Sequence, residues 1–488
     1  MTCWSISFIL SKSTLPKSDV MASKPFYCQV TNDHPVRIPD RLDYERCAEL
    51  HNEILRRGWT GSGRSLDQLE TVNWFEYYGQ AANDCRHLLS QDLIAFLEQA
   101  RMIKNDDQFC LFYYVTGLLG PDLIWESFDW IVEDEDKYRY LTLYGATSMA
   151  SHPDGLAFDQ RENKAVMQMS IHDTDITLNG RTPWFPLEMT LSAWLDMIDV
   201  GKIAAVDDSV QRVEKNVPWI CNHWNDLMVQ ETADAFNALV DSIETRMRDQ
   251  GFSVPKTSEP LLPDSVLDAS GIPPGFARSF VAKARRPAFT HIAPGLSVPT
   301  TQSFAQQPFY GGHDLEPEED FDHTSGAIKP IILFASSKSF QLADRDENED
   351  PPFQPPYDKS PSILAGLYLL ESERFLIHGF EDAVKLVLPF GVGANGYART
   401  SDGLSIGDRR TEEDSSCGDR YTELYQQGWN PFIEMHKVRL IKVFESWRGM
   451  VDRGDWKVGV DGVEETIEAF KEADTEEGWW KFVVPIGW

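Results

Sequence analysis

The feature that most constrains the fold is a long polar segment, residues 253–361, in the middle of the chain. It is rich in proline, glycine and serine, and it holds six acids in the nine residues 314–322 and five in the seven residues 344–350. Such a composition buries too little apolar surface to offset the entropy lost on ordering. The sequence therefore predicts a loop segment here. Within it, residues 275–286 are expected to form a short basic helix and Pro330–Ala335 a strand.

The residues on either side of this segment repeat apolar side chains at helical spacing. The ranges predicted to be helical are 40–57, 65–78, 84–103, 121–132, 186–203 and 219–248 before the segment, and 362–388, 431–451 and 463–473 after it. The run 362–388 is apolar nearly all round, which is typical of a helix buried in a large core. Residues 138–182 instead show short alternating runs and turn residues, a pattern that predicts a small β-sheet.

These patterns together predict a fold class and a division into domains. The fold class is mainly α with a small β element (α+β), in which two helical blocks pack together and are joined by a Pro/acid-rich loop segment. Residues 1–39 are expected to be a disordered tail, and residues 40–252 a helical block with a small β-hairpin region at 138–182. Residues 253–361 are the polar connector, and residues 362–488 form a C-terminal helical block that packs on the first.

The net charge excludes several classes of partner. Lys and Arg total 45 against 77 Asp and Glu, which gives the chain a formal charge of −32. So acidic a body repels phosphate backbones and anionic lipids, and no apolar run approaches the roughly 20 residues that cross a bilayer. The seven cysteines are sparse and lack CxxC spacing, so we expect reduced thiols. The sequence thus predicts a soluble, acidic, cytoplasmic protein that binds neither nucleic acid nor membranes.

The first candidate for chemistry is a pair of acids, Asp173 and Asp175, at the end of an apolar stretch. In a strand they share one face about 6.6 Å apart, and His172 points to the other face. Two such carboxylates are suited to Mg²⁺ or Mn²⁺. The stretch resembles the metal-binding motif of sugar-nucleotide glycosyltransferases, a resemblance that implies a transferase acting on a phosphorylated or nucleotide-sugar substrate. In the alternative interpretation, both acids are solvated beside a hairpin turn at Asn179-Gly180.

The second candidate is a glycine-rich loop that follows an apolar run. It has the form GxGxxG, and its candidate cofactor-binding residues are Gly391, Gly393, Gly396 and Arg399. Dinucleotide binding requires a strand before such a loop and a helix after it, so that backbone amides meet the pyrophosphate. The alternative is a helix that the glycines terminate. An overlapping GxSxG pattern around Ser405 is best explained as a chance match, since its flanks are polar.

The whole segment 391–414 is also a candidate lid, because Arg399, Arg409 and Arg410 can close over an anionic ligand. A further basic patch lies on the helix expected at 275–286. It can hold an acidic partner or pair with the acid cluster 314–322, and effective concentration favours the internal pairing.

Two functional hypotheses follow from these features. The slightly favoured one is a protein-binding, scaffold or accessory protein, because no spacing selects strongly for catalysis. The other is a metal-dependent enzyme that uses Asp173, Asp175 and the 391–414 lid. The expected partner is accordingly an unknown protein or a small anionic ligand.

Overall fold

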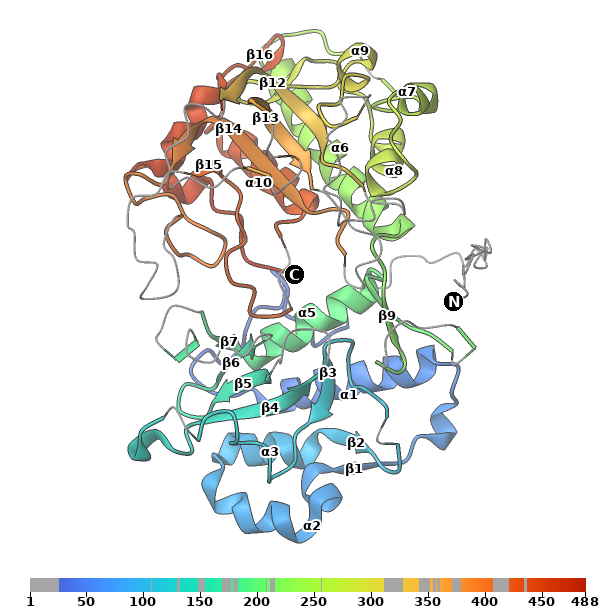
Figure 1. Cartoon of the computed structure of the whole chain (residues 1–488), viewed down its shortest axis with the longest axis vertical. Helices are drawn as coiled ribbons and strands as arrows, with labels where there is room; N and C mark the ends of the chain where they lie inside the picture. The colour runs from blue at the N-terminus through green and yellow to red at the C-terminus, as the bar shows by residue number, and fades with distance from the viewer. Residues whose placement is uncertain are drawn as a thin grey trace, which may run out of the picture.

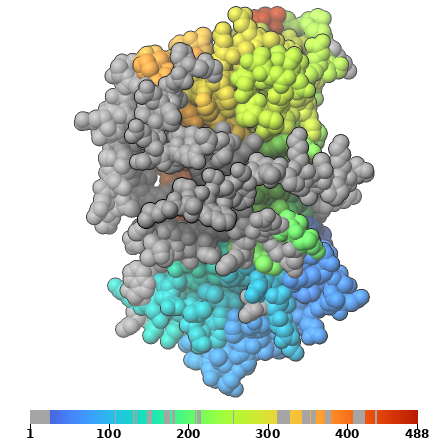
Figure 2. Space-filling model, turned by 45° about the vertical axis from the view of Figure 1, so that its right-hand side comes forward, coloured from blue at the N-terminus to red at the C-terminus, as the bar shows by residue number. Residues whose placement is uncertain are grey.

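The protein consists of two lobes, which Figures 1 and 2 show stacked along the long axis of the molecule. The computed structural model describes residues 26–488 except 107, 130–131, 148–153, 169–176, 179–182, 208, 211–215, 256, 311–327, 342–351, 354–356, 358–359, 371–378, 407–420 and 434–436. The first lobe, here the N-lobe, ends near Asn222. The second, the C-lobe, begins with the helix that Asn225 caps, and its C-terminal part returns to the N-lobe.

The N-lobe combines helices with a five-stranded antiparallel sheet. Its helices are α1 (Tyr44–Gly61), α2 (Trp74–Cys85), α3 (Gln91–Gln99) and α5 (Leu187–Asp199), with short 3-10 turns at Leu66–Gln68, Arg86–Leu88 and Asp134–Asp136. The sheet has the order β3 (Val115–Leu118), β4 (Tyr140–Ala146), β5 (Gly155–Asp159), β6 (Lys164–Gln168) and β7 (Phe185–Pro186). Two small antiparallel ribbons are β1 (Thr71–Asn73) with β2 (Arg101–Ile103), and β8 (Ile203–Ala205) with β9 (Trp219–Cys221).

The C-lobe is built on an eight-stranded sheet. Its strand order is β15 (Tyr421–Glu423), β14 (Val384–Val392), β13 (Ser362–Leu369), β12 (Ile331–Gln341), β11 (Leu296–Ser297), β10 (His291–Ala293), β17 (Gly462–Val463) and β16 (Val458–Gly459). Only the pairing of β10 with β17 is parallel among the strands described. The helices are α6 (Asp226–Asp249), α7 (Asp264–Ala269), α8 (Phe276–Lys283), α9 (Thr301–Phe304) and α10 (Leu440–Arg453), with 3-10 turns at Ile467–Asp474 and Trp479–Lys481.

Aromatic packing fixes the helices α6, α8 and α10 against one face of this sheet. The ring of Phe236 on α6 lies 5.8 Å from that of Phe334 on β12 and 5.2 Å from that of Phe444 on α10. Phe280 of α8 stacks on Phe444 at 5.7 Å. Burying an aromatic side chain of this size contributes about 1.5–3 kcal/mol. This cluster therefore holds the three helices and the sheet together as one core.

The prediction of a mainly helical chain is wrong. The run 362–388, expected to be a helix, contains β13 and β14. Its all-round apolar character arises because the sheet is covered on both faces. Leu367 and Leu369 face the main core, whereas Tyr368 and Val387 belong to a second cluster on the other face. A strand buried on both faces has no polar side, so its composition matches that of a buried helix.

The interpretation of 253–361 as a loop segment is wrong as well. This stretch supplies α7, α8, α9 and the strands β10, β11 and β12, and β12 lies in the interior of the sheet. The apolar residues Ile331–Phe334 are buried there. The acid clusters 314–322 and 344–350 lie outside the described residues. The two ordered pieces expected within the segment are present as α8 and β12, but averaging the composition over more than a hundred residues hid α7, α9 and the short strands β10 and β11.

The C-terminal part of the chain completes the N-lobe core. Phe432, Ile433 and Trp488 pack among its buried residues. The indole nitrogen of Trp194 on α5 donates to the carbonyl oxygen of Phe432 at 2.9 Å. The backbone amide of Met167 on β6 donates to the carbonyl oxygen of Pro431 at 3.0 Å. The two lobes are therefore joined by shared packing as well as by the chain. In the parts of the chain that the structure describes, no helix combines the length and apolarity needed to cross a bilayer.

Candidate functional site

A cleft of about 590 Å³ lies between α5 of the N-lobe and α10 of the C-lobe. We call it the inter-lobe cleft. The N-lobe contributes Ser192 and Asp196 of α5 and the segment Gln29–Asn32, and the C-lobe contributes one side of α10 and the segment Trp480–Trp488. Figure 1 shows the C-terminus between these two helices. Ligand sites occur preferentially where two such bodies meet, because side chains from both can converge on one volume.

A buried arginine shapes the N-terminal wall of the cleft. The Arg46 guanidinium donates to four backbone carbonyl oxygens, those of Cys28 at 2.6 Å, Pro35 at 2.8 Å, Gln29 at 2.8 Å and His34 at 2.9 Å. Hydrogen bonds from a charged donor are stronger than neutral ones. Arg46 is only 3 % exposed, so the segment 28–35 is wrapped around a fixed charge. The wall formed by Gln29–Asn32 is thus held in one conformation.

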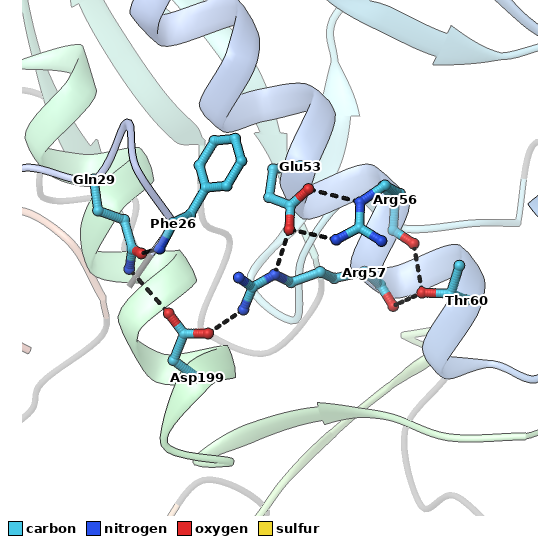
Figure 3. A network of polar contacts seen from close by, with 7 residues as sticks. All are labelled: Phe26, Gln29, Glu53, Arg56, Arg57, Thr60 and Asp199. Atoms are coloured by element: carbon cyan, nitrogen blue, oxygen red, sulfur yellow. Dashed lines mark hydrogen bonds and ion pairs between the residues drawn. The ribbon is translucent and has the colours of Figure 1, made fainter. Parts of the chain in front are cut away.

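A polar network, drawn in Figure 3, ties this wall to α1 and α5. The Gln29 amide donates to the Asp199 carboxylate at 3.1 Å, and Arg57 pairs with that same carboxylate. Arg57 also donates a hydrogen bond to Glu53 at 2.8 Å, and Arg56 donates two hydrogen bonds to Glu53, at 2.7 and 2.6 Å. Because the Asp199 carboxylate of α5 binds both Gln29 of the wall and Arg57 of α1, it ties the wall to the two helices.

The floor of the cleft is Trp488, which is 5 % exposed. Its ring lies 3.8 Å from the Arg439 guanidinium, and its indole nitrogen donates to the Asp196 carboxylate. Arg439 in turn donates to Asp382 at 2.6 Å, in an ion pair almost wholly removed from solvent. A desolvated cation over the face of tryptophan contributes about 2 kcal/mol. Asp382, Arg439, Trp488 and Asp196 therefore form one continuous series of contacts from the C-lobe to the N-lobe.

The C-lobe side of the cleft carries three cations. Lys442 and Arg453 come from α10 and Lys481 from the 3-10 turn Trp479–Lys481, whereas Asp196 and Glu445 are the acids of the lining. Lys442 pairs with Glu445 at 3.2 Å and Arg453 with Asp455 at 2.8 Å, both of them solvent-exposed pairs. Exposed pairs contribute only about 0–1 kcal/mol, so they exchange readily for other partners. The lining thus offers cationic groups in a chain whose net charge is −32.

Glu231 of α6 lies close to the charged groups of the cleft. Its half-buried carboxyl is influenced by Asp196 from α5, and by Arg439, Lys442 and Glu445 from α10 and the residue before it. Burial raises the pKa of Glu231 to about 7, an effect that the two acids reinforce and the two cations oppose. Glu231 therefore changes its charge near neutral pH.

We predict that Glu231→Gln stabilises the protein at pH 8 relative to pH 5. In the unfolded chain Glu231 ionises around pH 4.5, whereas in the folded protein it stays protonated up to about pH 7. The folded state therefore binds more protons in this window, and the wild type loses stability as the pH rises through it. Allowing for partial solvent exposure, the loss is about 1–2 kcal/mol. Urea unfolding of both proteins at pH 5 and pH 8 measures it, and an equal difference at both pH values contradicts the prediction.

Lys202, directly before β8, makes contacts across the lobe boundary. Its ammonium group is buried and donates to the carbonyl oxygens of Asn222 at 2.6 Å and Gly379 at 2.7 Å, and it lies 3.7 Å from the Phe380 ring centroid. Burial lowers its pKa, since the charged form loses its hydration. Three contacts that all favour a cation nevertheless surround it. Lys202 thus links the N-lobe to the segment that leads into β14.

The acids proposed to bind a metal, Asp173 and Asp175, lie outside the described residues, as does His172. Within the described part of the chain, no three His, Cys, Asp or Glu side chains are grouped so as to hold a metal ion. The metal-dependent transferase hypothesis therefore stays a prediction that rests on the sequence motif alone.

The glycine-rich loop surrounds an anion supplied by the protein itself. The Asp474 carboxylate accepts hydrogen bonds from the backbone amides of Gly393 and Asn395 at 3.0 and 2.9 Å through one oxygen, and of Tyr397 and Ala398 at 3.0 and 3.1 Å through the other. Successive amides in a loop form an anion-binding concavity. Here that concavity is filled by Asp474, a residue that the sequence analysis did not single out.

The remaining members of the motif have structural surroundings. Gly391 lies near the end of β14, and the Gly396 carbonyl accepts from the Arg399 guanidinium at 2.6 Å. Arg399 also donates to the Ser405 hydroxyl at 2.9 Å and lies 5.4 Å from the Trp479 ring. A strand precedes this loop, but no helix follows it, since the next described element is β15. Arg409 and Arg410, proposed for the lid, lie outside the described residues.

The basic residues of the segment 275–286 make ion pairs and hydrogen bonds with other residues of the C-lobe. Arg278 pairs with Asp268 at 2.5 Å, and Arg285 pairs with Asp241 and Glu244 at 2.6 and 3.0 Å. Arg286 donates to the carbonyl oxygen of Leu261 at 2.7 Å. The alternative partner, the acid cluster 314–322, lies outside the described residues.

The inter-lobe cleft was missed by the sequence analysis. Its lining comes from segments near residues 30, 190, 450 and 485, and no local spacing relates them. The aromatic C-terminal run Trp479-Trp480-Lys481-Phe482 was the one available signal. Comparisons with protein-family models, with curated proteins and with solved structures found no match for this chain.

Proposed function

We propose that this protein is a non-catalytic binding protein whose inter-lobe cleft holds an acidic segment of a partner protein. The observation that carries the proposal is the set of three cations, Lys442, Arg453 and Lys481, around a cleft formed by both lobes. Each of them pairs with an acid at or beside the cleft, Lys442 with Glu445, Arg453 with Asp455 and Lys481 with Glu472. In a chain whose net charge is −32, this group of cations in partly exposed pairs is the feature that favours exchange with a partner's carboxylates.

The contacts around the cations support reversible binding of carboxylates. Lys442 and Arg453 make exposed ion pairs with neighbouring acids, and a partner's carboxylates can take the place of these acids at little free-energy cost. Trp480 is 52 % exposed at the cleft, and the Arg453 guanidinium lies 5.9 Å from its ring. Exposed tryptophan and arginine are the residue types that most often dominate a protein–protein interface. An acidic segment with an apolar side chain fits this combination.

The test is selection from a random dodecapeptide library displayed on phage, followed by affinity measurement on the enriched peptides by fluorescence polarisation. We expect Asp- and Glu-rich peptides, and we expect Lys442→Glu combined with Arg453→Glu to weaken their binding about tenfold or more. Raising the salt concentration should weaken it too, because the charges are partly exposed.

The matched control is Arg448→Glu combined with Lys457→Glu. These two residues lie outside the lining, and their replacement changes the net charge by the same amount. The control should keep its affinity within about twofold, because only the overall field changes. Enrichment without acidic residues, or equal weakening in both double variants, would overturn the proposal.

A further inference from the structure

A second cavity of about 600 Å³ lies within the N-lobe, away from the inter-lobe cleft. We call it the N-lobe pocket. It is bounded by α1, α2, β2, β3 and the loop that follows β3, and its walls include Leu55, Tyr77, Tyr78, Met102, Phe109 and Leu118. Tyr77 and Leu123 at the pocket are 40 % and 50 % exposed. A volume of this size with mostly apolar and aromatic walls is typical of sites for small molecules.

Two polar side chains of the lining, those of His51 and Tyr78, are uncharged. His51 Nε2 lies 2.8 Å from the carbonyl oxygen of Arg101, and Nδ1 lies 2.9 Å from the Tyr144 hydroxyl. Because a carbonyl only accepts, Nε2 carries the proton and Nδ1 accepts from Tyr144. Burial lowers the pKa of His51 to about 4. The Tyr78 hydroxyl donates to the carbonyl oxygen of Leu118 at 3.1 Å, and burial raises its pKa to about 12.

The backbone is irregular on two sides of the pocket. Gly117 in β3 has φ of +153° and lies where the register with β4 shifts, and a Cβ placed there would meet nothing within 4 Å. A glycine in a strand often marks the point where a ligand approaches the backbone. Gly79, with φ of +59° and ψ of −123°, interrupts α2 directly after Tyr77 and Tyr78. Glycine adopts such positive-φ conformations without a steric penalty, which lets the backbone turn directly beside the two tyrosines.

We propose that the N-lobe pocket binds a small, uncharged molecule that contains two or more aromatic rings. Tyr77, Tyr78 and Phe109 provide ring faces and edges for stacking. The charged residues of the lining, Arg101, Asp106 and Asp122, carry both signs, and Asp106 is paired with Arg64 at 2.7 Å. The lining therefore selects no ionic ligand. The space over Gly117 admits the edge of a planar ring, and the proposal is independent of the function proposed for the inter-lobe cleft.

The test uses N-phenyl-1-naphthylamine, an uncharged fluorophore whose emission rises in apolar surroundings. We expect saturable binding to the full chain with one site per molecule. Ala81→Trp places a large ring into the pocket from an exposed position of α2, and it should reduce the affinity about tenfold or more. Tyr77→Ser removes one wall and should reduce it roughly threefold.

Two controls separate specific binding from general apolar contact. Gln99→Trp adds the same ring at an exposed position of α3 outside the pocket, and Lys442→Glu with Arg453→Glu alters only the inter-lobe cleft. Both should bind the fluorophore like the wild type, and circular dichroism checks that every variant is folded. Absence of saturable binding to the wild type, or unchanged affinity in folded Ala81→Trp, would overturn the proposal.

Discussion

Asp474→Ala is expected to destabilise the protein by about 3–5 kcal/mol, because it removes the acceptor of four backbone amides at once. The Asp474 side chain is 6 % exposed and holds the loop from Gly393 to Ala398 against the 3-10 turn Ile467–Asp474. An amide left without an acceptor in a buried position costs about 1–3 kcal/mol, and water can reach only part of this loop. The measurement is the free energy of unfolding in urea.

Asp474→Asn keeps the shape of the side chain but removes its charge, so it tests which of the two stabilises the loop. Its amide group keeps one oxygen acceptor but turns a donor towards the other two amides, so we expect a loss close to that of the alanine variant. Glu476→Ala is the matched control, because Glu476 is an exposed acid two residues away. It should change the stability by less than about 0.5 kcal/mol. A loss below about 1 kcal/mol in Asp474→Ala would show that the loop does not depend on this carboxylate.

Arg439→Ala is expected to cost about 3–5 kcal/mol, since it leaves the wholly buried Asp382 carboxylate without its cation. It also removes the guanidinium under the ring of Trp488, which forms the cleft floor. We therefore expect tryptophan fluorescence to report a loosened C-terminal segment at denaturant concentrations where the wild type is intact. Arg448→Ala on α10 removes an exposed pair with Asp452 instead and should cost less than about 1 kcal/mol.

A double-mutant cycle tests whether the pair acts as a unit. Combining Arg439→Met with Asp382→Asn removes both charges and keeps similar side-chain volumes. The loss of unfolding free energy in the double variant should therefore be about 2–3 kcal/mol smaller than the sum of the losses in the two single variants. Strict additivity of the two losses would contradict the assignment of Asp382 and Arg439 as one buried ion pair.

The helix α6 could be predicted because one of its faces is polar, whereas the strands β13 and β14 were mistaken for a helix because they have no polar face. On α6, Phe236, Leu239 and Ile243 are buried at helical spacing while the opposite side is exposed, so the period was visible. In β13 and β14 every side chain from Leu367 to Leu369 and from Leu386 to Leu388 is buried, so neither a period of two nor one of 3.6 stands out.

The sites depend on contacts that no local pattern records. Asp474 lies some 80 residues from the loop whose amides donate hydrogen bonds to it. At such a separation, no local sequence pattern marks an acid as the acceptor of these hydrogen bonds. The GxGxxG pattern was interpreted as a possible cofactor loop, and it gave no indication that the Asp474 carboxylate accepts the hydrogen bonds of its amides. Trp488 and Asp196 are separated by 292 positions, so the cleft floor could be found only after the lobes were placed together.

The return of the C-terminal segment to the N-lobe has a consequence for biosynthesis. At about 5–20 residues per second, a ribosome needs on the order of 10–40 s to advance from the end of β9 to Phe432. Throughout that interval Trp194 lacks the carbonyl that accepts its indole proton, and the places of Phe432, Ile433 and Trp488 are empty. The lobe that is translated first is therefore among the last to mature, and nascent chains that stall before residue 432 expose its unfinished interior to chaperones and proteases.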